Sequence, residues 1–199
     1  MSSVNGETRA KVATNLLRDY GYFNGSVSYQ EVPQKNPKEA KVSYVIDMAQ
    51  PYFLDSIAYL RYPHYADSLI RSTHSQSVLK SGENFSVLKL EEERQRLSSL
   101  FRNHGYYYYR PEFTTYRADT LQKPGYVSLQ VVPRNGVPTE ARKQYYIGKT
   151  SVYLTGYNDE LPTDTLRLRT MDIYYSGKKP GIRPSALMRN FFFRKGELF

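Results

Sequence analysis

The stretch Ser99-Leu-Phe-Arg-Asn-His-Gly-Tyr-Tyr107 decides the fold, because the chain contains it twice. Residues 15–23 read Asn-Leu-Leu-Arg-Asp-Tyr-Gly-Tyr-Phe, which is the same pattern of apolar, charged and aromatic positions. Both stretches end a helix-like pattern in a glycine followed by two aromatic residues. A glycine at this place is typical of a helix that ends in a left-handed residue. Self-similarity of this kind indicates repeated domains.

Two further matches define the length of the repeat. Val42-Ser-Tyr-Val-Ile46 matches Val127-Ser-Leu-Gln-Val131 at nearly the same offset, and Ser81-Gly-Glu-Asn-Phe85 recurs as Lys195-Gly-Glu-Leu-Phe199. One unit of about 85 to 90 residues is therefore complete once and partial twice. We expect the chain to enter in the middle of one copy and to stop in the middle of another.

The complete copy is predicted to run strand, helix, helix, strand, strand. Its strands are rich in aromatic and β-branched residues, and its second helix has apolar residues at three-and-four spacing. The predicted elements are a strand over 52–60, a helix over 67–79 capped by Asp67, a helix from Ser86 to near Gly105, and strands over 106–117 and 127–132.

Composition narrows the possible functions. The chain has 199 residues, 40% of them hydrophobic, which favours folded domains, and it has no cysteine. Disulfides, thiolate nucleophiles and zinc–thiolate sites are therefore excluded. No apolar run approaches the roughly 18–20 residues that span a bilayer. The first residues do not resemble a signal peptide, so we expect them to be the cut start of a longer protein.

The residue types that commonly form catalytic or metal sites are not grouped in this sequence. We therefore expect no enzyme activity, no metal site, no cofactor and no small-molecule substrate. His64, His74 and His104 fall in a predicted loop, a helix and a helix end, so they are not expected to converge. The acidic residues 91–93 are consecutive and would spread around a helix. No glycine-rich loop that could hold a phosphate is present.

A nucleic-acid-binding module is the alternative from another class of protein. The net charge is +9, and twenty tyrosines interleave with lysine and arginine, so bases could stack and phosphates could bind. The charges are scattered, however, and many of the tyrosines fall in predicted strands, where tyrosine commonly has one half-buried face. The strand interpretation is favoured, so nucleic acid is not an expected partner.

The order of elements and motifs resembles the POTRA domain. The resemblance is carried by the glycine–aromatic sequence after the second helix and the Gly-x-x-Phe loop before it, that is, by Gly21, Phe23, Gly82, Phe85, Gly105, Tyr107, Gly196 and Phe199. Tandem copies at this spacing are similar to the periplasmic arm of the BamA/TamA superfamily. The resemblance implies an α+β chain of tandem POTRA domains, each a three-stranded sheet packed on two helices.

The resemblance also implies domain limits. Residues 1–49 would be the C-terminal part of one POTRA domain and residues 50–136 a complete domain. Residues 137–199 would be the N-terminal part of a further domain, with a hairpin-like insertion near 157–179.

The function that the resemblance implies is that of the periplasmic arm of an outer-membrane protein assembly factor. The arm would be attached to the outer membrane through a C-terminal barrel that this chain lacks. Its partners would be unfolded outer-membrane clients, periplasmic accessory proteins or lipoproteins, and that barrel. The arm of a two-partner secretion transporter is an open alternative.

The family pattern places the second strand at the sheet edge, where a client could add a strand of its own. Pro111 within the predicted strand also favours an edge position, because proline cannot donate to a ladder. The alternative is an edge that pairs only with water. The predicted client-binding residues are Tyr106, Tyr108, Arg110, Asn24, Ser26 and Ser28.

The four consecutive tyrosines that begin at Tyr106 would lie on both faces of the predicted strand. A strand points successive side chains to opposite faces. Alignment with the first copy predicts that Tyr107 and Tyr109 face the helices, while Tyr106 and Tyr108 face outward.

Overall fold

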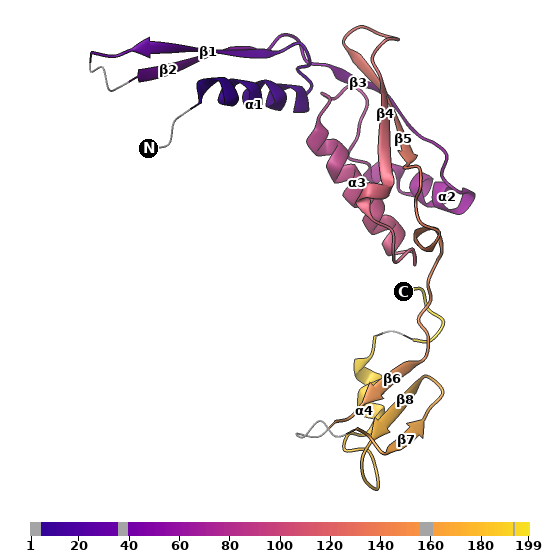
Figure 1. The fold of residues 1–199 in the computed structure, drawn as a ribbon. Helices are drawn as coiled ribbons and strands as arrows, with labels where there is room; N and C mark the ends of the chain where they lie inside the picture. The colour runs from indigo at the N-terminus through magenta and orange to yellow at the C-terminus, as the bar shows by residue number, and fades with distance from the viewer. Residues whose placement is uncertain (1–4, 36–39, 156–160, 193) are drawn as a thin grey trace. The chain divides into compact units, whose positions relative to one another are not determined.

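The computed structural model describes residues 5–35, 40–155, 161–192 and 194–199, with helices and strands in an α+β arrangement (Figure 1). The contacts between residues divide the chain into two compact units. The first unit contains Met1–Leu100 and Arg110–Val137. The second unit contains Phe101–Tyr109 and Pro138–Phe199.

The first unit begins with helix α1 (Gly6–Asp19), followed by strands β1 (Ser26–Pro33) and β2 (Ala40–Asp47). Asn5 caps α1, since its side chain accepts a hydrogen bond from the Thr8 N–H at 3.0 Å. β1 and β2 form an antiparallel two-stranded sheet, along which α1 lies (Figure 1).

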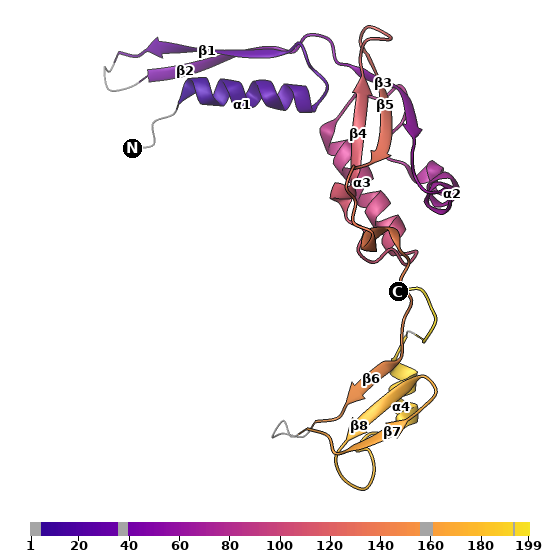
Figure 2. The same ribbon diagram turned by 45° about the vertical axis from the view of Figure 1, so that its right-hand side comes forward.

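Most of the complete copy lies in the rest of the first unit, while its residues Phe101–Tyr109 belong to the second unit. Strand β3 (Phe53–Tyr59), helix α2 (His64–Ser72), helix α3 (Val87–Arg102) and strands β4 (Thr114–Asp119) and β5 (Tyr126–Pro133) follow in that order. β5 is the central strand, parallel to β3 and antiparallel to β4 (Figure 2). The predicted strand–helix–helix–strand–strand order and fold class are confirmed.

The core of this copy is formed by apolar residues from the sheet and both helices. β5 supplies every second residue from Val127 to Val131 to it, as a strand does along one face, and the next residue, Val132, is buried as well. The side chains that are almost completely inaccessible to solvent are Leu54, Ile70, Leu97, Val127, Leu129 and Val131.

Two predicted elements were placed wrongly. The helix expected over 67–79 is α2, which begins at His64, so Asp67 lies in its first turn, and a short 3₁₀ helix η1 (His74–Gln76) follows it. The strand expected over 106–117 is a turn, then the 3₁₀ helix η2 (Pro111–Phe113), and only then β4. The argument from Pro111 therefore fails, although β4 is an edge strand.

The second unit has its own small sheet. β6 (Thr150–Tyr153), β7 (Asp164–Arg167) and β8 (Met171–Tyr175) follow the 3₁₀ helix η3 (Glu140–Arg142), and helix α4 (Pro184–Asn190) comes last. β8 is central, parallel to β6 and antiparallel to β7. This is the same pairing as in the three-stranded sheet of the first unit, where β5 is central.

The predicted hairpin-like insertion overlaps this sheet. Residues 157–160 lie outside the described residues, and residues 164–175 form an antiparallel pair of strands whose second member also joins β6. Met171 and Ile173, both in β8, are buried. That the hairpin is an insertion in a POTRA domain stays a prediction.

Candidate functional site: the β4 edge

Strand β4 presents backbone hydrogen-bonding groups at the edge of the sheet. Its pairing with β5 is antiparallel, and the Arg134 N–H donates to the Phe113 carbonyl oxygen at 2.8 Å. Since antiparallel pairs alternate between bonded and non-bonded residues, Thr115 and Arg117 exchange hydrogen bonds with β5. The N–H and C=O groups of Tyr116 and Ala118 therefore point away from the sheet.

The side chain of Tyr116 contacts helix α3. These contacts hold the residue in place and leave its outward backbone groups accessible. The Tyr116 hydroxyl donates to the Leu90 carbonyl oxygen at 2.6 Å, and the Arg94 guanidinium lies 5.1 Å from the ring centroid. Burial raises the pKa of Tyr116, so it stays neutral at physiological pH. Arg117 and Ala118 are exposed, and the small Ala118 side chain leaves room beside the strand.

The opposite edge, strand β3, is partly occupied at its start. The Leu54 N–H donates to the Glu83 carbonyl oxygen at 2.8 Å, and the Gly82 N–H donates to the Leu54 carbonyl oxygen at 2.7 Å. The pairing of β3 with β5 also shifts register between Leu54 and Ser56, which marks a bulge. β4 is therefore the more accessible edge of this sheet.

The three predicted site residues of the first copy lie at the start of the corresponding strand. Asn24 is in the turn before β1, and Ser26 and Ser28 are exposed residues of β1. The Val27 N–H donates to Thr14 Oγ1 on α1 at 3.0 Å, so it points away from β2. By alternation, the backbone groups of Ser26 and Ser28 face β2, which leaves them no free backbone for a client.

The three predicted site residues of the complete copy are not on a strand. Tyr106, Tyr108 and Arg110 precede β4, and the Tyr109 N–H donates to the Tyr106 carbonyl oxygen at 2.9 Å, which closes a turn. A turn does not alternate its side chains as a strand does. Tyr106 and Tyr109 are therefore the buried pair and Tyr107 and Tyr108 the exposed pair, so the predicted register was wrong.

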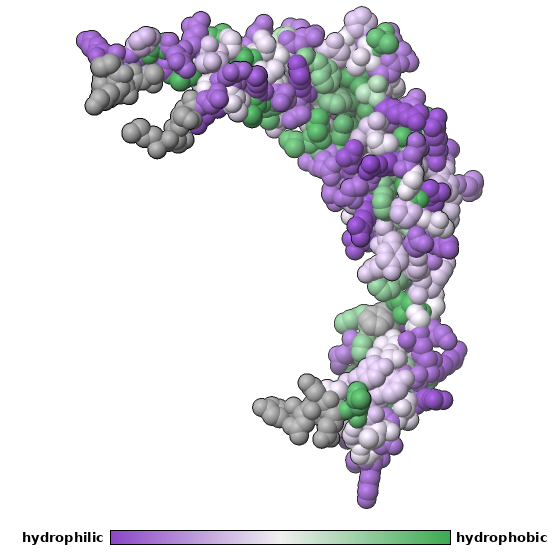
Figure 3. Space-filling view, viewed as in Figure 1, coloured by the Kyte–Doolittle hydropathy of each residue, from purple (hydrophilic) through white to green (hydrophobic). Residues whose placement is uncertain are grey.

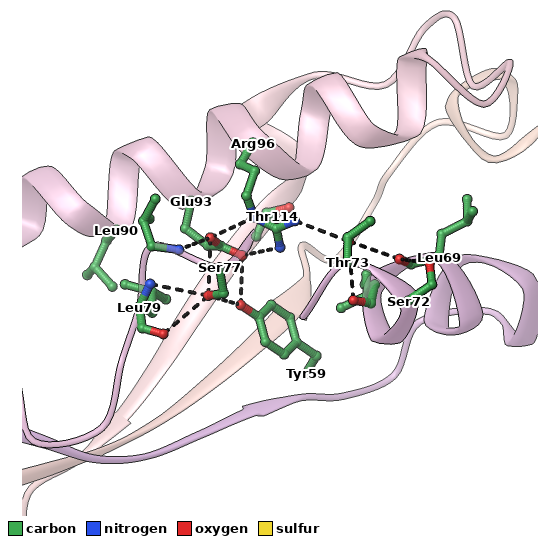
Figure 4. A network of polar contacts seen from close by, with 12 residues as sticks. Tyr59, Leu69, Ser72, Thr73, Ser77, Leu79, Leu90, Glu93, Arg96 and Thr114 are labelled. Atoms are coloured by element: carbon green, nitrogen blue, oxygen red, sulfur yellow. Dashed lines mark hydrogen bonds and ion pairs between the residues drawn. The ribbon is translucent and has the colours of Figure 1, made fainter. Parts of the chain in front are cut away.

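A buried charged cluster connects α3 to β3 and α2 (Figure 4). The Glu93 carboxylate, which is inaccessible to solvent, accepts hydrogen bonds from Arg96 at 2.6 and 2.9 Å and from the Tyr59 hydroxyl at 2.7 Å. It also accepts from the Ser77 hydroxyl at 3.4 Å and the Val78 N–H at 3.1 Å. Burial raises the pKa of Tyr59 to about 12, and its hydrogen bond to Glu93 acts in the same direction.

The cluster stabilises the fold. The Glu93 carboxylate is inaccessible to solvent and accepts hydrogen bonds from β3, from α3 and from the segment that follows η1. The burial of Glu93 was not predicted, although this residue lies three positions after Leu90 and four before Leu97, on the apolar face of α3. Across the described ranges, no group of three or more His, Asp or Glu side chains could hold a metal ion.

The three histidines lie on different elements. His64 begins α2 and is not in the predicted loop, His74 begins η1, and His104 follows α3. None of the helices in the described part of the chain combines the length and the apolar character needed to cross a membrane.

No family model and no curated protein matches the chain. Three solved structures are similar: POTRA3–5 of BamA from Haemophilus influenzae (TM-score 0.44, 10% identity), POTRA1–3 of Omp85 from Anabaena (0.30, 15%), and the N-terminal domain of Omp85 from Thermosynechococcus elongatus (0.32, 14%). They cover 97%, 97% and 96% of this chain. The chain spans 63%, 65% and 65% of theirs, less than two thirds of each. The strand–helix–helix–strand–strand order and the three-stranded sheet of residues 53–133 are those that the resemblance to POTRA domains implies.

Proposed function

We propose that this chain is a periplasmic POTRA arm that binds extended client polypeptides during the assembly of outer-membrane proteins. It acts as a scaffold rather than an enzyme, and its partners are client polypeptides and periplasmic accessory proteins or lipoproteins. Residues 1–49, 50–136 and 137–199 belong to three successive domains in this proposal. The observation that carries it is the accessible edge of β4.

A client would bind by adding a strand next to β4. The backbone groups of Tyr116 and Ala118 offer two donors and two acceptors at the spacing of an extended chain. Each hydrogen bond contributes a net of roughly 0.5–1.5 kcal/mol, so four contribute roughly 2–6 kcal/mol. Since association itself costs about 4–15 kcal/mol, additional side-chain contacts are needed and binding should be weak and reversible. Such binding suits a protein that receives clients and passes them on.

The substitution Ala118→Pro tests this mode directly. Proline removes the outward N–H but leaves the hydrogen bonds between β4 and β5 intact, because the N–H of residue 118 does not face β5. Binding of an extended peptide with the alternating sequence of an outer-membrane strand is expected to weaken about tenfold, the equivalent of one hydrogen bond. The dissociation constant is measured by chemical-shift titration.

Ala118→Val is the matched control, since it adds a side chain at the same place and keeps the N–H. It should bind the peptide about as well as the unaltered chain. Denaturant unfolding of both variants establishes that β4 stays folded. Equal affinities for the proline and valine variants would show that the client does not pair with this edge.

A further inference from the structure

The two sequence motifs that define the repeat meet in space. In the first unit, the turn that follows α1 contacts the residues that lead into β3. The Tyr52 N–H donates to the Gly21 carbonyl oxygen at 2.9 Å, and the Phe85 N–H donates to the Tyr52 carbonyl oxygen at 2.9 Å. Tyr52 is thus held between the glycine turn of one copy and the Gly-x-x-Phe loop of the next.

The second unit contains the same arrangement. The Tyr145 N–H donates to the Gly105 carbonyl oxygen at 2.7 Å, and the Phe199 N–H donates to the Tyr145 carbonyl oxygen at 3.0 Å. We call each arrangement a joint: Gly21, Tyr52 and Phe85 form the first, and Gly105, Tyr145 and Phe199 the second. Each joint lies within one compact unit.

The Gly-x-x-Phe loop is attached to the residue two positions after Tyr52 or Tyr145 in the same way in both joints. In the first, Leu54 exchanges hydrogen bonds with Gly82 and Glu83 at 2.7 and 2.8 Å. In the second, Ile147 exchanges hydrogen bonds with Gly196 and Glu197, both at 2.8 Å. Two segments with different sequences therefore make the same four backbone contacts. This indicates that the joint is a recurring structural feature of the repeat.

Aromatic rings cover the hydrogen bonds of each joint. Phe23 lies 5.0 Å from Tyr52 and 5.1 Å from Phe85, measured between ring centroids. In the first unit, Figure 3 shows hydrophobic residues gathered where α1 ends and α3 begins, the region of this joint. Tyr107, which takes the place of Phe23 in the second joint, lies 4.5 Å from Phe199.

Both joint glycines have a left-handed backbone conformation, and a side chain on Gly21 would collide with backbone, whereas one on Gly105 would meet the movable Leu198 side chain. Gly21 has a φ of +88° and Gly105 a φ of +84°, in the left-handed region. A Cβ atom on Gly21 would lie 2.8 Å from the Phe85 carbonyl oxygen, and one on Gly105 would lie 2.7 Å from Leu198 Cδ2. Gly136 has a φ of +79° and nothing within 4 Å of such an atom.

We propose that the glycine–aromatic turn after each second helix is a docking site for the next copy of the repeat. Its ligand is the residue that leads into the first strand of that copy, together with the Gly-x-x-Phe loop. Recognition rests on backbone hydrogen bonds, a left-handed glycine and one aromatic ring on each side. The backbone groups of the turn are consequently bonded within the chain and are not available to clients.

Gly21→Ala tests the first joint, with Gly136→Ala as its control. Both substitutions place alanine at a left-handed φ, but only the first makes the new Cβ atom collide with a carbonyl oxygen. Amide hydrogen exchange is the readout. Gly21→Ala should speed exchange of the Tyr52 and Phe85 amides at least tenfold and leave buried β5 amides such as that of Val131 unchanged. Gly136→Ala should leave the Tyr52 amide as protected as in the unaltered chain.

A milder variant covers the case in which Gly21→Ala fails to fold. Phe23→Leu keeps the glycine and should speed exchange of the same two amides by a smaller factor. A Tyr52 amide that exchanges at the rate of an unprotected one in the unaltered chain, or equally fast exchange in the two alanine variants, would overturn the proposal. Neither readout depends on client binding, so failure here is distinguishable from failure of the β4 edge.

Discussion

Glu93→Ala is expected to lower the free energy of unfolding of the first unit by about 3–5 kcal/mol, the range for removal of one partner from a buried ion pair. The substitution leaves the Arg96 guanidinium in a largely buried place without its carboxylate. It also removes the acceptor of the Tyr59 hydroxyl and of the Val78 N–H. Urea unfolding followed by circular dichroism measures the change.

Glu91→Ala is the matched control for this prediction. Glu91 lies on the same helix and pairs with Arg94 at 3.2 Å, but its side chain is 51% exposed. An exposed pair of this kind contributes about 0–1 kcal/mol, so the control should be close to neutral. Similar losses for the two variants would mean that the Glu93 cluster does not hold α3 against β3 and α2.

Tyr109→Ala is expected to destabilise the second unit by about 3–5 kcal/mol, as large-to-small aromatic substitutions in cores do. The Tyr109 ring is 8% exposed, and its centroid lies 4.5 Å from that of Phe101, which is itself 1% exposed. Truncation would leave a cavity against Phe101 that the surrounding turn cannot close. The free energy of unfolding from guanidinium titration is the measurement.

Tyr108→Ala provides the comparison in the same run of tyrosines. Its side chain is 47% exposed, and its ring makes T-shaped contacts with Tyr107 and Tyr145. We expect a smaller loss of about 1–3 kcal/mol, the scale of two aromatic pairs. A larger loss for Tyr108→Ala than for Tyr109→Ala would contradict the burial of the Tyr109 ring against Phe101.

The four tyrosines show how far a repeat can be interpreted from sequence. The match of Gly105 with Gly21 correctly indicated where the second helix ends, because a left-handed glycine stops a helix whatever follows. It could not indicate that a turn follows. That turn is closed by the hydrogen bond between Tyr106 and Tyr109, and tyrosine favours strands when considered alone.

The β4 edge and Glu93 show two other limits to what can be predicted from the sequence. The edge position of the second strand was predicted from the family pattern, but the exposed backbone positions depend on the phase of pairing with β5, which only the register reveals. Glu93 is a different case, since its place on the apolar face of α3 was visible. Apart from Arg96 on the same helix, its partners lie 15 to 34 residues away in sequence, so their convergence could not be predicted.

The joints and the β4 edge divide the surface of the complete copy between two tasks. The Gly-x-x-Phe loop pairs with the start of β3, and the glycine turns receive the following copy, so these backbone groups are used within the chain. β4 lies on the other side of β5 and is free of these contacts. A client that adds a strand at β4 would therefore leave the first joint undisturbed.

The most direct test of strand addition at β4 is amide hydrogen exchange with and without an extended client peptide. The account predicts that the peptide slows exchange of the Tyr116 and Ala118 amides, which point outward, and leaves the Thr115 and Arg117 amides, already bonded to β5, unchanged. Binding that protects none of these amides, or that protects only residues of α2 and α3, would contradict it.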